Sequence, residues 1–246
     1  MKNLHPIPLF ADNYAWLLTD AATGAVGVVD PADAGPVIEA VAAGPGRLDL
    51  ILLTHHHADH IAGAEAVKAR FGAAIVGASA DRHRLPPLDR AVAEGDEVAL
   101  GASRARVLAT PGHTRGHIAF FFEDFAGEGP LLVAGDTLFS LGCGRLLEGT
   151  AEEMFASLAK LAALPGGTLL AAGHEYTAAN GRFALTMEPE NAALARRLEE
   201  VARLRAAGLP SLPVRLAEEF AANPFLRARD VASFARLRAA KDAFKG

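Results

Sequence analysis

The sequence predicts a layered α/β domain followed by a smaller helical part. Over residues 1–174, short apolar runs alternate with segments whose apolar residues recur at helical spacing. After residue 174 no β-rich run follows, and the apolar residues recur only at the spacing of helices. Sheet segments flanked by helices pack in layers around one core. We therefore expect a catalytic domain over residues 1–174 and a helical domain over residues 175–246.

The elements of the first part follow from spacing and end signals. The pattern predicts strands over residues 24–30, 73–78 and 117–123, and helices over residues 34–43 and 60–71. Gly72 stands where a glycine cap ends a helix. Thr150 and Glu153 form the pattern of a capping box, so a further helix is expected to begin there.

The second part reads as helices separated by breaks. Between residues 191 and 207, one helical face is apolar and consists of Leu194, Leu198, Val201 and Leu204. Gly208 and Pro210 end this helix. A proline-broken connector then leads to a short helix and to a last helix over residues 231–244.

Composition limits the classes of protein that fit. No apolar run approaches the ~18 residues of a membrane span, and the first residues lack the apolar segment of a signal peptide. The single cysteine, Cys143, excludes an intramolecular disulfide and fits a reducing compartment. The formal charge of −5 gives no reason to expect nucleic acid. We expect a cytoplasmic monomer that binds neither membranes nor nucleic acid.

The most informative motif is the polar cluster at residues 54–60, which follows the apolar run at residues 48–53. Side chains alternate along an extended segment, so His55 and His57 should point to the same side. Asp59 and His60 are adjacent and diverge, which lets them reach a second position. One loop therefore offers ligands to two metal ions.

Three further candidate ligands, His113, Asp136 and His174, each follow a glycine near the end of an apolar run. Imidazoles and carboxylates are ligands for zinc, and also for iron or manganese. Any one of these residues could be an ordinary polar loop residue. Five histidines and two aspartates in this order instead predict a metal site on the rim of the sheets.

This ligand order resembles the binuclear site of the metallo-β-lactamase fold and, within that fold, glyoxalase II, the hydroxyacylglutathione hydrolases. The narrower resemblance rests on four local strings, GDTLFSLGCGR at residues 135–145, GHEYT at 173–177, NPFLR at 223–227 and KDAF at 241–244. It implies an αββα sandwich with a small C-terminal, all-helical, substrate-binding domain.

The resemblance also implies how the ligands divide. One metal would take His55, His57 and His113, the other would take Asp59, His60 and His174, and Asp136 would bridge them. We expect two divalent ions, with zinc as the first candidate and iron or manganese as alternatives. A hydroxide bridging the ions would act as nucleophile, with Asp59 orienting it or accepting a proton. Asp30 would hydrogen-bond a ligand histidine from behind, or else simply form a turn before Pro31.

The substrate implied by the resemblance is S-D-lactoylglutathione, hydrolysed to D-lactate and glutathione in methylglyoxal detoxification. A thiol with a pKa of ~8.5 leaves as thiolate without a strong general acid, which suits such a site. The residues expected to bind glutathione are Arg145, Tyr176, Arg238 and Lys241. A spacing of three places Arg238 and Lys241 on one helical face, although such pairs are often only solvated surface. Leu147 stands where the family often has Tyr, so one hydroxyl contact would be lost.

Other functions remain open at this point. A persulfide dioxygenase with a single iron would leave His60 and His174 without a role. A lactonase or another thioesterase would share the metal site but would not need the basic tail, and a silent metal-binding module would not need all the ligands. His5, His56, His83 and His117 show no ligand pattern, and His56 should point away from the metals.

Overall fold

The computed structural model describes residues 1–245 and is built around two six-stranded sheets. The first sheet has, in spatial order, β1 (Leu4–Leu9), β2 (Asn13–Thr19), β3 (Val26–Val29), β4 (Leu50–Leu52), β5 (Ala74–Ala78) and β6 (Arg90–Val92). The second has β14 (Val214–Arg215), β13 (Leu169–Ala172), β10 (Leu131–Gly135), β9 (Ile118–Phe122), β8 (Ser103–Ala109) and β7 (Glu97–Leu100).

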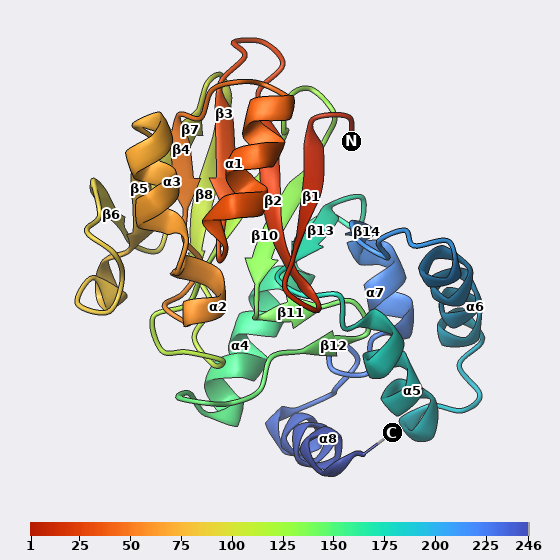
Figure 1. Ribbon diagram of the computed structural model, residues 1–246. Helices are drawn as coiled ribbons and strands as arrows, with labels where there is room; N and C mark the ends of the chain where they lie inside the picture. Colours follow the sequence, from red (N-terminus) through yellow and green to blue (C-terminus); the bar gives the residue numbers. More distant parts are fainter. Residues whose placement is uncertain (246) are drawn as a thin grey trace.

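Helices lie outside the two sheets (Figure 1). Helices α1 (Ala34–Ala43) and α3 (Ala64–Phe71) pack on the outer face of the first sheet. Helix α4 (Ala151–Ala162) contributes Met154, Leu158 and Leu161 to the core cluster that includes the second sheet. The predicted αββα sandwich is therefore confirmed.

Strand direction explains where a site can form. Strands β3 and β4 run parallel, and so do β10 and β13. Parallel strands present their carboxyl ends at the same edge of a sheet, where ligands commonly bind. The loops that follow these four strands begin at or lead to Asp30, His55, Asp136 and His174. The arrow of β10 points downward in Figure 1, so this edge lies at the lower end of the sheets.

Most predicted elements are present, with one break. The predicted helix over residues 60–71 is in fact two, α2 (Ala58–Ile61) and α3. The main-chain N–H of Gly63, between them, donates to the carbonyl of Pro31 at 3.0 Å. A Cβ at Gly63 would lie 2.5 Å from that oxygen, so only glycine fits this close approach. At the other end of α3, Gly72 has φ 73° and caps the helix as predicted.

The C-terminal part consists of α5 (Thr177–Met187), α6 (Ala192–Ala206), α7 (Leu216–Ala222) and α8 (Val231–Ala243). The expectation that no strand follows residue 174 is wrong in one place, since β14 pairs with β13 and extends the second sheet. A short hairpin, β11 (Leu138–Phe139) and β12 (Gly142–Cys143), and a 3-10 turn, η1 (Ser79–Asp81), complete the chain. Within residues 1–245, every helix is too short or too polar to cross a bilayer.

Candidate metal centre and adjoining cavity

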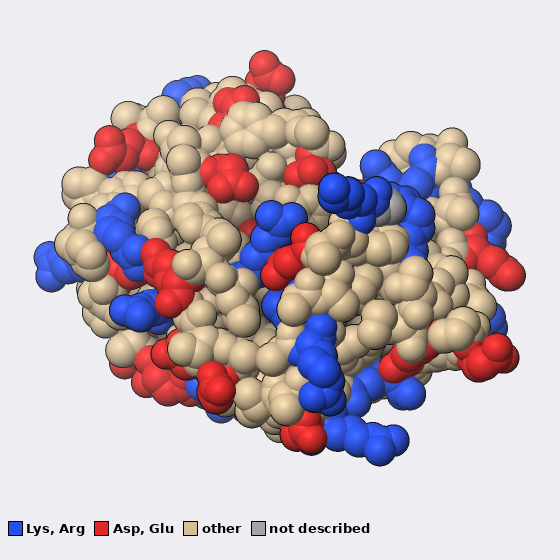
Figure 2. Space-filling model, turned by 90° about the horizontal axis from the view of Figure 1, so that it is seen from below, with Lys and Arg blue, Asp and Glu red and all other residues tan. Residues whose placement is uncertain are grey.

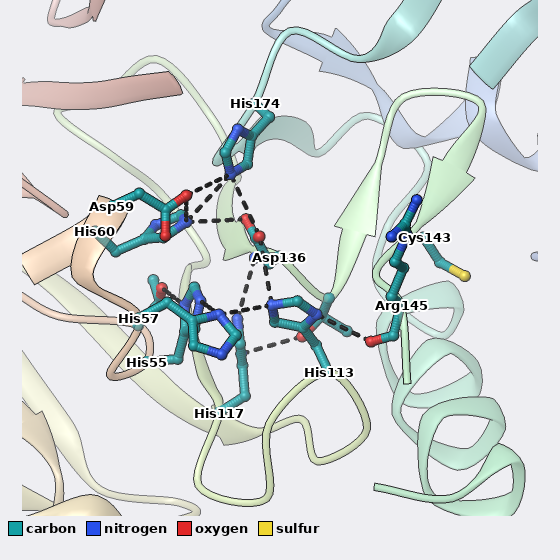
Figure 3. A network of polar contacts seen from close by, with 12 residues as sticks. His55, His57, Asp59, His60, His113, His117, Asp136, Cys143, Arg145 and His174 are labelled. Carbon is teal, nitrogen blue, oxygen red and sulfur yellow. Dashed lines mark hydrogen bonds and ion pairs between the residues drawn. The ribbon is translucent and has the colours of Figure 1, made fainter. Parts of the chain in front are cut away.

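The first cluster of candidate ligands contains His55, His57 and His113. Nδ1 of His57 lies 3.0 Å from Nε2 of His55 and 3.0 Å from Nε2 of His113. The three nitrogens therefore face a common point (Figure 3). His55 and His57 come from the loop after β4, and His113 comes from the loop after β8. Three imidazole nitrogens converging in this way are a typical zinc-binding arrangement.

The second cluster contains Asp59, His60 and His174. Nε2 of His60 lies 3.3 Å from Nε2 of His174. Oδ2 of Asp59 is 3.6 Å from the His174 nitrogen and 3.9 Å from the His60 nitrogen. Helix α2 supplies Asp59 and His60, and the loop after β13 supplies His174. This second group also faces one point.

Asp136 lies between the two clusters (Figure 3). Its Oδ1 is 3.4 Å from Nε2 of His60, and its Oδ2 is 3.5 Å from Nε2 of His113 and 3.4 Å from Nε2 of His174. Oδ1 is buried and has no hydrogen-bond partner. A buried carboxylate oxygen without a partner is a costly arrangement that a cation would satisfy. The donor set therefore fits divalent cations.

Most of these histidines also have a hydrogen-bond partner for the ring nitrogen that faces away from the clusters. The contacts are His60 Nδ1 to Asp30 Oδ2 at 3.0 Å, His174 Nδ1 to Asp12 Oδ1 at 3.0 Å, His113 Nδ1 to the Arg145 carbonyl at 2.9 Å, and His55 Nδ1 to Thr54 Oγ1 at 3.0 Å. Metal-binding histidines usually donate their second N–H to a carboxylate or carbonyl, which fixes the tautomer and the ring orientation. The partners of His60, His113 and His174 leave the other nitrogen free for a cation.

The charges of the buried groups agree with this arrangement. Burial raises the pKa of Asp136, but His60 and His174 outweigh burial and hold that pKa well below its usual value. Burial lowers the pKa of His60, but the carboxylates of Asp136 and Asp30 outweigh it and hold the pKa well above the usual value. Burial and the neighbouring His60 lower the pKa of His55 well below its usual value. Asp136 is therefore an ionised carboxylate at neutral pH.

Asp30 and Asn13 brace the second cluster. Asp30 has φ 50° and accepts hydrogen bonds from the main-chain N–H and Oγ1 of Thr54 at 2.8 and 2.7 Å, besides its contact with His60. Nδ2 of Asn13 donates to the carbonyl and to Oδ2 of Asp59 at 2.9 and 3.1 Å. Sequence reasoning did not single out Asn13 or its neighbour Asp12, because nothing in their spacing relates the first hairpin to a loop far along the chain.

His117 is a third residue whose place near the site the sequence did not reveal. It is buried, its Nε2 lies 3.1 Å from the main-chain nitrogen of Asp136, and its ring stacks on His55 at 4.8 Å. An isolated histidine at the start of an apolar strand shows no sequence pattern that would indicate a role at the site. His56 points away from both clusters, as expected, and its Nδ1 lies 3.2 Å from Asp81.

A cavity of about 480 Å³ adjoins the candidate metal ligands. It reaches from His113 and Asp136 toward α5 and α8, and its lining includes Phe139, Cys143, Arg145, Tyr176, Asn180, Arg238, Lys241 and Phe244. Seen from below, Lys and Arg side chains lie beside the hollow in this face (Figure 2). All four residues predicted to bind substrate therefore line one cavity next to the candidate metal ligands.

These four residues differ in what they already contact. Tyr176 stacks on His174 with ring centroids 4.5 Å apart, and the Arg145 side chain is 70% exposed. Nζ of Lys241 donates to the Ala179 carbonyl at 3.2 Å. Burial and the nearby cations of Arg238, Arg182 and Arg145 lower the pKa of Lys241. An anionic ligand would relieve this repulsion.

Arg238 is only 4% exposed and is largely engaged within the protein. Its Nη1 donates to the Cys143 carbonyl at 2.8 Å and its Nη2 donates to Asp242 at 2.9 Å, while Nε has no partner. Burial raises the pKa of the Cys143 thiol to about 11, so this thiol is not an activated nucleophile.

Comparison with known proteins agrees with the site. Residues 10–174 match the family described as the metallo-beta-lactamase superfamily, and residues 175–244 match that described as hydroxyacylglutathione hydrolase C-terminus. The hydroxyacylglutathione hydrolase of Acidiphilium cryptum (strain JF-5) is 59% identical over 238 residues, which cover 97% of this chain and 95% of that protein. The one from Rhodobacter capsulatus is 55% identical, with 98% and 92% covered. The chain belongs to the hydroxyacylglutathione hydrolase family. The resemblance predicted from the motifs is thereby confirmed.

Solved structures extend this likeness to the fold. A crystal structure of ETHE1 from Myxococcus xanthus superposes on this family member with a TM-score of 0.70 at 27% identity, covering 96% of this chain and 89% of that one. A structure of TTHA1623 in a di-iron-bound form gives a TM-score of 0.57 at 27% identity, with 69% and 91% covered.

Proposed function

We propose that this chain is a thioester hydrolase that cleaves S-D-lactoylglutathione to D-lactate and glutathione. The relatives named hydroxyacylglutathione hydrolase support this substrate class. Two convergent clusters of candidate ligands lie at one end of a cavity, and the other end of the cavity is cationic. This placement is the observation that carries the proposal. Glutathione has two carboxylates, which suit the cationic end, and its thioester would then lie toward the clusters.

We assign one cation to His55, His57 and His113 and the other to Asp59, His60 and His174, with Asp136 shared. We propose zinc at both positions. The structure of TTHA1623 in a di-iron-bound form supports two-metal occupancy in a related fold and keeps iron as an alternative. When bound, two such cations would lower the pKa of a water molecule from 15.7 toward ~7 and polarise the thioester carbonyl.

The protein's own residues would orient the reacting groups. Asn13 holds Oδ2 of Asp59, so that Asp59 presents a fixed carboxylate beside the site for orienting a water molecule or accepting its proton. Burial and the carboxylate of Asp12 raise the pKa of Tyr176, so its hydroxyl stays protonated and can donate to the substrate. The thiolate leaving group needs no strong general acid, because a thiol pKa of ~8.5 is close to neutral pH.

We further propose that residues 1–174 supply the metal ligands and residues 175–246 supply most of the substrate seat. Tyr176, Arg238 and Lys241 belong to the second part, and Arg145 belongs to the first. We propose a cytoplasmic location, because the single cysteine, Cys143, fits a reducing compartment. We also propose a monomer, and the burial of Cys143 disfavours a disulfide between two chains. Size-exclusion chromatography with light scattering would test the oligomeric state.

The rival with a single iron, a persulfide dioxygenase, would make no use of His60 and His174. Both of these histidines face the same point as Asp59, and both have a carboxylate behind the far ring nitrogen. Such bracing is expected for ligands and not for idle loop residues.

The decisive experiment measures hydrolysis of S-D-lactoylglutathione beside a thioester without glutathione, with metal analysis of the same sample. His113→Ala removes a ligand, and His83→Ala removes an exposed histidine outside both clusters as a matched control. We expect the control to keep activity and metal, and the His113 variant to lose both. Equal rates on the two thioesters would leave a metal hydrolase but overturn the glutathione assignment.

A further inference from the structure

We infer that His117 is a positioning residue that holds Asp136 in the orientation needed to face both ligand clusters. This inference rests on the proposed role of Asp136 as the shared ligand. His117 has no nitrogen directed into either cluster, and its two ring nitrogens are occupied on opposite sides by the bridge residue and by threonines. It therefore acts through Asp136 and does not bind a cation itself.

The hydrogen bonds of His117 fix which ring nitrogen carries the proton. The main-chain N–H of Asp136 donates to Nε2 at 3.1 Å, so Nε2 must be unprotonated. Nδ1 therefore carries the hydrogen and faces Oγ1 of Thr110 at 2.9 Å and Oγ1 of Thr137 at 3.1 Å. Oγ1 of Thr137 in turn donates to Oγ1 of Thr110 at 2.9 Å. The main-chain N–H of Asp136, which can only donate, thus sets the tautomer, and the threonine hydroxyls can accept from Nδ1.

Close packing around Gly135 leaves the bridge residue little freedom. Gly135 has φ 49°, and a Cβ added there would lie 2.5 Å from Oγ1 of Thr54 and 2.8 Å from Nε2 of His117. The end of strand β10 is therefore pressed against the His117 ring just before Asp136. That ring also stacks on His55, with centroids 4.8 Å apart and 24° between the planes. One buried ring thus contacts both the bridge residue and a ligand of the first cluster (Figure 3).

Two substitutions of His117 can separate the hydrogen-bond acceptor at Nε2 from the space that the ring fills. In His117→Gln the amide oxygen can occupy the place of Nε2 and accept the Asp136 N–H. In His117→Asn the amide can occupy the place of Nδ1 and face the threonines, but it is too short to reach Asp136. Both variants remove the imidazole, and only one of them retains the acceptor.

The affinity of each variant for two Mn²⁺ ions would be measured by competition with a chelator, beside the melting temperature of the chelator-treated protein. Loss of a group that braces a metal ligand typically costs 10- to 100-fold in metal affinity. We expect His117→Asn to lose affinity by this factor, and His117→Gln to stay within a few-fold of the wild type. The melting temperatures of the two variants should fall by similar amounts.

A measurement on the unmutated protein guards against a variant that fails to fold. Nitrogen-15 chemical shifts of histidine side chains distinguish the two neutral tautomers, and the signal of His117 would be assigned by its disappearance in His117→Gln. We expect the form protonated on Nδ1. Finding the proton on Nε2 would overturn the inference, because that nitrogen could not accept from Asp136.

The remaining outcomes are also decisive. Wild-type Mn²⁺ affinity in His117→Asn, or equal losses in the Asn and Gln variants, would show that His117 only fills space. A wild-type protein that binds a single Mn²⁺ would overturn the two-metal assignment and this inference together. Activity on S-D-lactoylglutathione plays no part in the comparison, so failure of the proposed substrate would leave it intact.

Discussion

Arg238 donates a hydrogen bond from Nη1 to the carbonyl oxygen of Cys143 at 2.8 Å, across 95 positions of the sequence. This contact ties α8 to the end of strand β12, two residues before Arg145. Lys241 lies one turn further along α8 and is held less firmly. Its Nζ donates one hydrogen bond, of 3.2 Å, to the Ala179 carbonyl. Arg238 and Lys241 look equivalent in the sequence. In the structure Arg238 mainly holds α8 in place, whereas Lys241 is available to bind substrate.

The first prediction separates the structural role of Arg238 from the substrate-binding role of Lys241. Lys241→Met should raise KM for S-D-lactoylglutathione with little change in kcat, because it removes binding remote from the reacting carbonyl. A hydrogen bond to a charged group contributes roughly 1.5–3 kcal/mol, so kcat/KM should fall about tenfold to a hundredfold. Arg238→Met should in addition lower the free energy of unfolding by about 1–3 kcal/mol, since it leaves the buried Cys143 carbonyl without its partner.

Steady-state kinetics and urea unfolding would be compared for both variants. Lys68→Met, which breaks a surface pair with Asp89 away from the cavity, serves as the control. Hydrolysis of a thioester without glutathione should barely change in Lys241→Met. Equal losses on the two substrates would remove Lys241 from the glutathione seat.

The second prediction concerns the shared ligand. Asp136→Ala should release or weaken both cations, because its two oxygens face His60 on one side and His113 and His174 on the other. His60→Ala should chiefly weaken the cation of the second cluster. Metal stoichiometry by inductively coupled plasma analysis, with activity on the same samples, would compare them. An Asp136→Ala protein that kept both metals and most of its activity would contradict the bridging assignment.

The third prediction tests the carboxylate behind His174. Oδ1 of Asp12 lies 3.0 Å from Nδ1 of His174, so Asp12→Asn should weaken binding of the second cation and lower activity, at most by about 10- to 100-fold. The loss should lie toward the lower end of that range, since the Asp12 side chain is 41% exposed. Asp33→Asn is the control, because Asn caps helix α1 as well as Asp does. Unchanged metal affinity in Asp12→Asn would show that His174 is oriented by other contacts.

Several of the candidate ligands could be predicted from the sequence because they stand just after a strand. His55, Asp136 and His174 follow apolar runs that are buried strands, and these strands present their carboxyl ends at one edge of the two packed sheets. The residues that brace them were not predictable in the same way. Asp12 reaches His174 across 162 positions, and its place depends on how the first hairpin packs against the second sheet. No periodicity encodes such a contact.

The same limit applies to the fold. The amphipathic segments around Val37 and Val201 were found because each buries one face. The break at Gly63 depends on a close approach to Pro31, which lies in a different loop. Strand β14 has only two residues and pairs with β13 through tertiary packing, so its own sequence carries no strand signal.

The fourth prediction is a pH dependence of stability away from the metal site. Asp20 is 1% exposed and accepts hydrogen bonds from Thr23 and Ser103, and these bonds outweigh burial and lower its pKa from 3.8 to about 2. A carboxyl whose pKa is lower in the folded state stabilises that state above its unfolded pKa. Its contribution, about 2 kcal/mol at pH 7, is lost as the pH falls from about 4 to 2.

Urea unfolding of the chelator-treated protein at pH 7 and pH 3 would measure this loss. The wild type should lose about 1 kcal/mol more between these pH values than Asp20→Asn does. Glu39→Gln, on the exposed side of α1, should behave like the wild type. Parallel losses in Asp20→Asn and the wild type would mean that Asp20 does not titrate in this range.

The last prediction is that a substitution of Leu147 strengthens substrate binding. Leu147 is 59% exposed and stands two residues after Arg145, where the sequence resemblance leads us to expect Tyr. If a phenolic hydroxyl at this position contacts glutathione, Leu147→Tyr should lower KM for S-D-lactoylglutathione and leave kcat unchanged. A neutral hydrogen bond contributes about 0.5–1.5 kcal/mol, so the expected gain in kcat/KM is about twofold to tenfold. Leu147→Phe adds the ring without the hydroxyl and should give a smaller gain. An equal gain in the Phe and Tyr variants would assign the effect to apolar contact, and no gain in either would place residue 147 outside the glutathione seat.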